Sequence, residues 1–353
     1  RLSANTPPGP GAAGAPTPAD EPPTEVFLTS PSGPRTASPP RSVPSVIPRL
    51  PPAGRPRRPG RRTALTASGF LAPFAVLFLT MMIAPIGYAI YQSFFTVHRA
   101  GLFGGTQSTE FAGLSNYAAA FGDHDFIASI IRVVLLGCVQ VPVMLGLALL
   151  LALLLDSRSA RLRKTFRLAF FLPYALPGAI AALMWSFLLA KSLSPFTGPL
   201  SHLGIHTDFL SPSWVPVSIG NMITWGWTGY NMLIIYSALQ TIPAEVMEAA
   251  ALDGCTGWRL AWAVKIPLVR PALVLTTVFS IIGTAQMYTE PAVLVGARIP
   301  GVDPKFSPIM NTTVALDVGG QNVAAAQSVV LALITLVLSF GFLKYNQRKG
   351  AMA

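Results

Sequence analysis

The sequence predicts an all-α polytopic membrane protein, and three observations support this fold class. Apolar residues make up 52% of the 353 residues, whereas charged residues make up only 11%. Apolar stretches of 20 or more residues recur after position 63, and a helix of about that length crosses the roughly 30 Å hydrocarbon core of a bilayer. Basic residues are unevenly shared between the segments that join these stretches, as in membrane proteins of fixed orientation.

The N-terminal segment, residues 1–62, differs from the rest of the chain. It holds 17 of the 33 prolines and very few large apolar side chains. Burial therefore cannot offset the conformational entropy lost on ordering, and we predict a disordered tail rich in Pro and Arg. The segment lacks the apolar core and small-residue cleavage site of a signal peptide. The membrane domain is expected over residues 63–350.

Six apolar segments within this domain are long enough to span a membrane. They lack the regularly spaced polar faces that buried helices of a large soluble protein would show. We therefore predict six transmembrane helices, at about 70–94, 127–155, 168–189, 217–239, 272–295 and 323–342.

The distribution of Lys and Arg predicts the orientation. An even number of spans places both termini on one side, and a cytoplasmic N-terminus puts 20 of the 25 basic residues on the inner side. Without the tail, 11 inner basic residues stand against five outer ones, which follows the positive-inside rule. Both termini and the loop 241–267 are therefore expected in the cytoplasm. The net charge of +11 reflects this asymmetry, so nucleic-acid binding need not be invoked.

The loop 241–267 carries the signals of a short helix outside the bilayer. Pro243 suits a first helical turn, Glu245 favours the positive end of the helix dipole, and Gly254 suits the residue just past the helix end. Glu245 and Glu248 share a face by their spacing of three, and the alanines at 249–251 keep the helix slim. By itself this pattern is equally compatible with an ordinary amphipathic loop helix.

A motif in this loop resembles the EAA motif of bacterial ATP-binding cassette importer permeases. It reads Glu248-Ala249-Ala250, then Asp253-Gly254-Cys255, then Val264, Ile266 and Pro267. Cys255, Val264 and Ile266 are conservative departures from the usual residues. Further segments are similar to the carbohydrate-uptake branch, in particular to the first permease of the maltose and glycerol-phosphate type: 70–73, 92–94, 111–117, 170–173 and 238–243. The resemblance covers residues 65–350.

The resemblance implies a type I importer permease fold in the bacterial plasma (inner) membrane, with a cytoplasmic EAA coupling helix seated on a separate ATPase. Its implied partners are a second homologous permease, an ATPase dimer, an extracytoplasmic solute-binding protein, membrane lipid and a carbohydrate substrate. The chain lacks a Gly-x-x-x-x-Gly-Lys-Ser/Thr phosphate-binding motif, so ATP and Mg²⁺ are expected on the ATPase, and this chain needs no catalytic residue or cofactor of its own. The residues implied in coupling are Glu245, Glu248, Ala249, Ala250, Asp253, Gly254 and Pro267.

Polar residues within two spans indicate where substrate could bind, because such groups are costly at membrane depth unless they face a cavity or a partner. Aromatic faces and amide or hydroxyl groups are suited to sugars. In the alternative, the hydroxyls bond their own helices and the tryptophans pack against lipid or the second permease. The candidates are Thr224, Trp227, Tyr230, Asn231, Ser280, Thr284, Gln286, Met287 and Tyr288. Trp225 and Glu290 lie nearby, and Glu290 is either a channel residue or interfacial.

Two other functional classes predict different patterns. A stand-alone secondary transporter or channel predicts ionisable residues in mid-span and inverted repeats, neither of which is clear here. A membrane enzyme predicts clustered metal or catalytic ligands. His202 and His206 have the spacing of a metal pair but lack a third ligand cluster, so a solvated loop and no metal site are expected. Asp123, His124 and Asp125 form either a turn or a surface for the binding protein.

Overall fold

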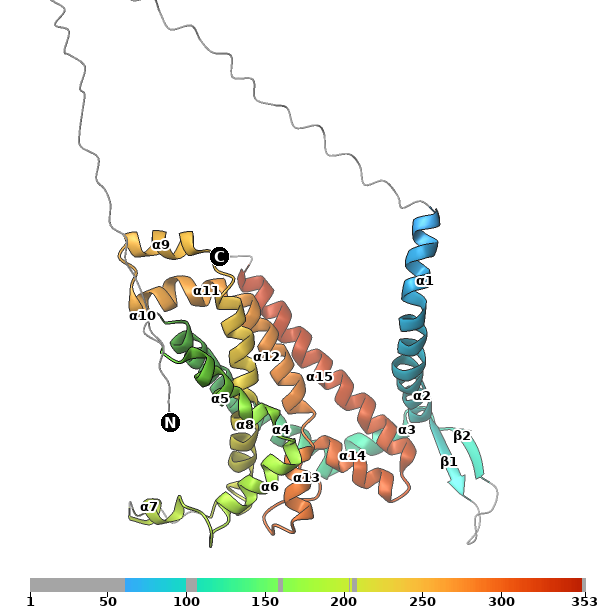
Figure 1. Cartoon of the computed structure of the whole chain (residues 1–353). Coiled ribbons are helices and arrows are strands. Elements are labelled where there is room, and N and C mark those ends of the chain that lie inside the picture. Colours follow the sequence, from blue (N-terminus) through green and yellow to red (C-terminus); the bar gives the residue numbers. More distant parts are fainter. Residues whose placement is uncertain (1–60, 100–106, 158–160, 203, 205–207, 351–353) are drawn as a thin grey trace, which may run out of the picture. The chain divides into compact units, whose positions relative to one another are not determined.

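The computed structural model describes residues 61–99, 107–157, 161–202, 204 and 208–350. The chain divides into two units, residues 1–62 and 63–353, and the second contains the fold shown in Figure 1. The predicted disordered tail therefore lies almost wholly outside the described residues, and so does His206.

The first predicted span is one continuous run of helix. It consists of α1 (Arg61–Phe78), a π-helical turn η1 (Leu79–Ile83) and α2 (Ala84–Ser93). The wide turn lies directly before Pro85, which has no N–H to donate to the preceding turn. An antiparallel hairpin follows, in which β1 (Phe95–Arg99) pairs with β2 (Gln107–Phe111), and then α3 (Ser115–Gly122).

The centre of the fold is the pair of helices α4 (His124–Asp156) and α8 (Val215–Leu239). The Asp123 carboxylate caps α4 by accepting hydrogen bonds from the backbone N–H groups of Asp125 and Phe126, which satisfies donors that a helix start leaves free. Small residues of α4 let α8 approach closely in one buried cluster, formed by Ala148, Ala152 and Leu155 with Met232, Ile235, Leu239 and Val269.

The third predicted span, 168–189, is not straight. It consists of α5 (Arg163–Ala175) and α6 (Gly178–Leu189), which meet at an angle of 95°. Leu176 is extended, with φ −76° and ψ 138°, because a residue that precedes proline disfavours the helical conformation. Pro177 is therefore the physical reason for the bend.

The remaining helices complete the bundle. They are α7 (Thr197–His202), α9 (Ala244–Leu252), α10 (Gly257–Leu260), the π-helical turn η2 (Ala261–Lys265), α11 (Ile266–Leu268), α12 (Arg270–Ala285), α13 (Thr289–Gly296), α14 (Pro308–Asp317) and α15 (Gln321–Gly350). Figure 1 shows α9 at one end of the bundle and α13 and α14 at the other. We call these the α9 end and the α14 end.

Four helical segments within the described residues are long and apolar enough to cross a membrane: 68–93, 124–156, 270–296 and 321–348. The bent pair α5–α6 is a fifth if it counts as one span. The predicted span 217–239 is present as α8 but does not join this group; its helix carries buried polar residues such as Ser218, Thr228 and Asn231. Several membrane-length helices are thus present, and the count of six stays a prediction.

Candidate functional site

The predicted loop helix is present as α9, with well-defined ends. Pro243 is its N-cap, one position before the predicted first turn. At the other end Gly254 has a φ of +74°, a conformation that residues with a side chain disfavour. Its N–H donates to the Ala251 carbonyl at 3.1 Å, and the Cys255 N–H donates to the Ala250 carbonyl at 2.9 Å. This pair of bonds is a Schellman motif, so the helix stops at Gly254 as the sequence predicts.

The residues predicted for coupling lie mostly on the surface. Only Ala250 is buried; Glu245, Glu248, Ala249, Asp253, Gly254 and Pro267 are exposed. A second exposed feature lies beyond the turn, where the rings of Trp258 and Trp262 meet at 5.8 Å between centroids. The exposed surface of α9 therefore offers two carboxylates and a slim backbone to a partner, and one of them, Glu248, also lines the cavity described next.

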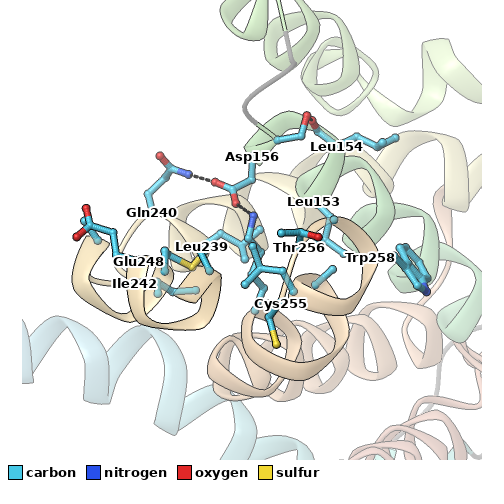
Figure 2. A pocket seen from close by; sticks show the side chains of 18 of the residues that line it. Leu153, Leu154, Asp156, Leu239, Gln240, Ile242, Glu248, Cys255, Thr256 and Trp258 are labelled. Carbon is cyan, nitrogen blue, oxygen red and sulfur yellow. Dashed lines mark hydrogen bonds and ion pairs between the residues drawn. The ribbon is translucent and has the colours of Figure 1, made fainter. Parts of the chain in front are cut away.

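A cavity of about 680 Å³ lies beneath α9. Its walls come from the ends of α4 and α8 and from α9, α10 and η2, and Figure 2 shows Glu248 on one side and Trp258 on the other. Most of the wall is apolar, with Leu154 and Leu239 among the lining residues. The cavity separates the exposed face of α9 from the membrane-length helices.

One carboxylate in this cavity joins three elements. Asp156, the last residue of α4, accepts a hydrogen bond from the Lys265 ammonium at 2.5 Å and another from the Gln240 amide at 2.7 Å. Figure 2 shows both bonds. The Asp156 and Lys265 side chains are only 16% and 12% exposed, so the ion pair is largely shielded from water. Sequence reading did not single out this pair, because its members are 109 positions apart.

A second cavity, of about 220 Å³, collects the residues predicted to bind substrate. Eight of the nine line it, namely Trp227, Tyr230, Asn231, Ser280, Thr284, Gln286, Met287 and Tyr288. Met144 of α4 and Ile223 of α8 complete part of the wall. Residues chosen for their polarity on two separate spans thus meet around one space, although their role toward a substrate stays a prediction.

The segment 286–288 interrupts the predicted span 272–295 at this cavity. Gln286 is the C-cap of α12 and Tyr288, with a φ of −141°, precedes α13. Non-helical backbone at membrane depth is tolerated where it lies against protein or lines a cavity. The expected single helix is therefore two helices, and their junction supplies three of the lining residues.

Thr224 does not line the second cavity, but it belongs to a hydrogen-bonded group behind its wall. Buried Gln140 of α4 accepts a bond from the Thr284 hydroxyl at 3.0 Å and donates to the Thr224 hydroxyl at 3.4 Å. The Asn231 amide donates to the carbonyl of Trp227 in its own helix, in line with the alternative of a backbone-bonded polar group. Gln140 was missed by sequence analysis, although a lone amide within an apolar span was the available signal.

Tyr174 is a further residue that the sequence analysis missed. Its ring stacks on Tyr230 at 4.7 Å and meets the edge of Trp227 at 5.1 Å between centroids. It lines an adjoining cavity of about 200 Å³, which shares Trp227 and Glu290 with the substrate-candidate cavity. Glu290 is half-buried and lines both cavities. This position favours the interpretation of Glu290 as a channel residue over that of a purely interfacial residue.

The comparison with known families decides the identity of the fold. Residues 144–349 match the family described as "Binding-protein-dependent transport system inner membrane component". The chain belongs to this family. The matched region includes the lining residues of both cavities, α9 and the break between α12 and α13, whereas Gln140 lies just outside it.

The permease is similar to transport proteins of known substrate. It is 32% identical to the lactose transport system permease protein LacF of Rhizobium radiobacter over 229 residues, which cover 63% of this chain and 73% of LacF. It is 30% identical to the sn-glycerol-3-phosphate transport system permease protein UgpA of Agrobacterium fabrum over 282 residues, covering 76% and 90%. The sulfoquinovosyl glycerol permease SmoG of the same organism is 29% identical over 291 residues, covering 81% and 91%.

A solved structure supports the fold of the permease. The chain superposes on a bacterial ABC transporter involved in the import of the acidic polysaccharide alginate with a TM-score of 0.65 and 18% identity, covering 81% of this chain and 96% of the other. The likeness confirms the helical importer-permease fold.

Among the other candidate groups of the permease, Asp123 has a structural role. The second carboxylate oxygen of Asp123 accepts hydrogen bonds from the Asn311 and Gln327 amides at 3.2 and 3.3 Å, so Asp123 fastens α14 and α15 to the start of α4. Within the described residues, no three His, Cys, Asp or Glu side chains form a group that could hold a metal ion.

Proposed function

We propose that this chain is one of two permease subunits of an ATP-driven importer for a carbohydrate. The observation that carries the proposal is the meeting of eight predicted residues around one cavity in a chain of this family. Its aromatic rings suit sugar faces, and its hydroxyl and amide groups suit sugar hydroxyls. The relatives are named for lactose, glycerol phosphate and sulfoquinovosyl glycerol, which supports a sugar or a sugar derivative over an unrelated solute.

The coupling role belongs to α9. Glu245 and Glu248 are exposed on a slim helix whose end is fixed by Gly254, a shape suited to a groove of a separate ATPase. Glu248 supplies a polar contact, Ala249 permits close approach, and Ala250 anchors the helix inward. Asp253 and Pro267 shape the two ends of the turn that follows. ATP and Mg²⁺ are held by that ATPase, and this chain has no ATPase site of its own.

Transport then proceeds by alternating access. The two permeases rock about the cavity, which opens outward while ATP holds the ATPase dimer closed and inward after hydrolysis. The α9 end faces the cytoplasm together with both chain termini, and the α14 end receives substrate from an extracytoplasmic binding protein. The plasma membrane of a bacterium is the setting.

The experiment that tests the proposal begins with the binding protein encoded beside this permease, titrated by calorimetry against a panel of neutral, phosphorylated and acidic sugars. The complete transporter is then reconstituted in proteoliposomes, and uptake of the best-binding sugar is measured. We expect uptake that requires ATP, stops with vanadate and is indifferent to ionophores. Uptake by this chain alone, driven by an ion gradient, would instead establish the secondary-transporter alternative.

A further inference from the structure

Asp156 occupies a position that local helix physics does not favour. It ends α4, where the helix dipole is negative and a carboxylate is destabilising. The Lys265 ammonium and the Gln240 amide compensate this charge by bonding its two oxygens. Removing one partner of a shielded ion pair leaves an uncompensated charge, which is strongly unfavourable. The position of Asp156 is thus explained by its partners and by nothing within α4.

The two partners of Asp156 bracket the loop that contains α9. Gln240 directly follows α8 and precedes α9, while Lys265 ends η2, after α9 and α10. Both ends of the loop are therefore fastened to one carboxylate on a third element, and α9 projects from this base. A displacement of α9 that moves the base must also move the end of α4.

The helices that lead from Asp156, Gln240 and Lys265 reach the substrate-candidate cavity: α4 and α8 directly, and η2 through α11 and α12. Gln140 and Met144 lie on α4, Trp227 and Asn231 lie on α8, and Thr284 lies on α12, which begins five residues after Lys265. Lys265 also lies in a π-helical turn, a departure from the regular helix that is frequent at functional sites. Helices α4 and α8 therefore connect the Asp156 base directly to the walls of the cavity, and Lys265 is connected to α12 through the short α11 and Val269.

From this geometry we infer that Asp156, Lys265 and Gln240 form a latch that transmits the movement of α9 to the helices lining the substrate-candidate cavity. The three are positioning residues, since they contact neither substrate nor nucleotide. The inference rests on the proposed function, because it assumes that α9 is the element moved by an ATPase.

The test measures how fast a cysteine placed in the substrate-candidate cavity reacts with a reagent added from the cytoplasmic side. A single cysteine replaces Ser280, which lines the cavity, in a chain carrying Cys138→Ala and Cys255→Ala. Inside-out vesicles hold the complete transporter with its binding protein, so added nucleotide and an impermeant maleimide reach the same side. ATP with vanadate should slow labelling of the cysteine. We define protection as the ratio of the labelling rates without and with ATP and vanadate. In the Asp156→Asn and Lys265→Met variants we expect this ratio to fall about fivefold or more, within the range of ordinary allosteric coupling.

A charge-reversal variant distinguishes loss of movement transmitted from α9 from simple destabilisation of the protein. The double variant Asp156→Lys with Lys265→Asp restores an ion pair and should restore the protection, and the exposed Asp317→Asn control should retain it. Co-purification of the four kinds of subunit reports assembly for every variant. If the single variants fail to assemble, the double variant decides: assembly with protection supports the latch, and its absence overturns it.

The remaining outcomes distinguish the latch from the function on which it rests. Full protection in both single variants would overturn the latch while leaving the proposed function in place. Loss of protection that charge reversal does not restore would also overturn it. A transporter with native Asp156 and Lys265 that shows no protection with ATP and vanadate would refute the proposed function itself.

Discussion

The cavity at the α9 end and the substrate-candidate cavity hold polar groups in different ways. The cavity at the α9 end contains a full ion pair, Asp156 with Lys265, whose charges compensate each other and leave a largely apolar wall. The wall of the substrate-candidate cavity is also largely apolar, but the polar groups on it are amides, hydroxyls and the polar atoms of Trp227 and Tyr230, with Glu290 as its one carboxylate. Fixed charges suit a joint that must hold one geometry, whereas dipoles suit a surface that must bind and release a solute.

The first prediction concerns the crossing of α5 and α8, which brings the Tyr174 ring against Trp227 and Tyr230. A Cβ atom at Gly229 would lie 1.9 Å from the carbonyl oxygen of Phe170, so Gly229→Ala must push the helices apart. We expect a loss of at least about 2 kcal/mol in the free energy of unfolding, measured by thermal melting of the purified complex. Gly226→Ala in the same helix meets no atom within 4 Å and should melt like the wild type.

The second prediction concerns the ring surface of the substrate-candidate cavity. Trp227→Ala removes a face that contacts both Tyr174 and Tyr230. Because such aromatic contacts contribute about 0.5–1.5 kcal/mol beyond their area, sugar uptake should fall about tenfold in reconstituted vesicles while assembly is retained. Trp214→Ala, at the start of α8 and outside both cavities, is the matched control. Equal uptake in the two variants would contradict the role given to Trp227.

The third prediction concerns the α9 end. Gly254→Ala places a side chain on a residue with a φ of +74°, at a cost of about 1–2 kcal/mol. We expect the turn after α9 to shift and sugar-stimulated ATP hydrolysis to fall about fivefold, with unchanged assembly. Gly341→Ala in α15 has open space and an ordinary φ and should leave hydrolysis unchanged. Normal stimulation of ATP hydrolysis by sugar in the Gly254→Ala variant would show that the end of α9 has no part in coupling.

The fourth prediction tests the buried support of the cavity wall. Thr284→Val removes the hydroxyl bonded to Gln140 at 3.0 Å, whereas Thr224→Val removes the longer bond of 3.4 Å. A buried amide left without its partner costs about 1–3 kcal/mol, so Thr284→Val should lower both the melting temperature and the apparent sugar affinity more than Thr224→Val does. A larger loss in Thr224→Val than in Thr284→Val would show that the hydrogen bond with Thr224 is the one that holds the Gln140 side chain.

The smallest effect is expected at the exposed ion pair of the α14 end. Lys305 bonds Asp125 at 2.7 Å, but the side chains are 33% and 53% exposed, and such pairs contribute little. Lys305→Ala should shift the melting temperature by less than about 3 °C. The hydrogen bond to Asp125 raises the pKa of Lys305 above its ordinary value of 10.5. The small stabilisation should therefore stay constant from about pH 6 to 9 and be lost on the alkaline side as the pH rises through the raised pKa of Lys305, and on the acid side as the pH falls through the pKa of Asp125, which the same hydrogen bond lowers.

Sequence reasoning located features that depend on neighbours in the chain. The end of α9 at Gly254 follows from local backbone preference, and the residues at spacings of three and four on α8 and α12 follow from helical periodicity. It did not locate Tyr174, Gln140 or the Asp156–Lys265 pair. Those contacts depend on which helices pack together. A single sequence does not show which residues meet when they lie about a hundred positions apart.

The bend at Pro177 and the break at 286–288 show a second limit. Pro173 and Pro177 lie within an apolar run that by hydropathy alone reads as one helix, and the break contains no proline at all. Pro291, in the first turn of α13, has no N–H for the Met287 carbonyl, so α12 cannot continue unbroken into α13. Thr284 and Met287 are buried beside the break, and hydropathy alone shows neither effect.

The interruption between α12 and α13 has a consequence for how the lining of the cavity can differ between related permeases. Gln286, Met287 and Tyr288 line the cavity yet belong to no regular helix. Gln286 and Tyr288 are exposed, whereas Met287 belongs to the buried core, so exchange of the first and the last alters the lining with the least disturbance of α12 and α13. Under the proposed function, changes at these two positions alter the solute while the surrounding helices keep their packing.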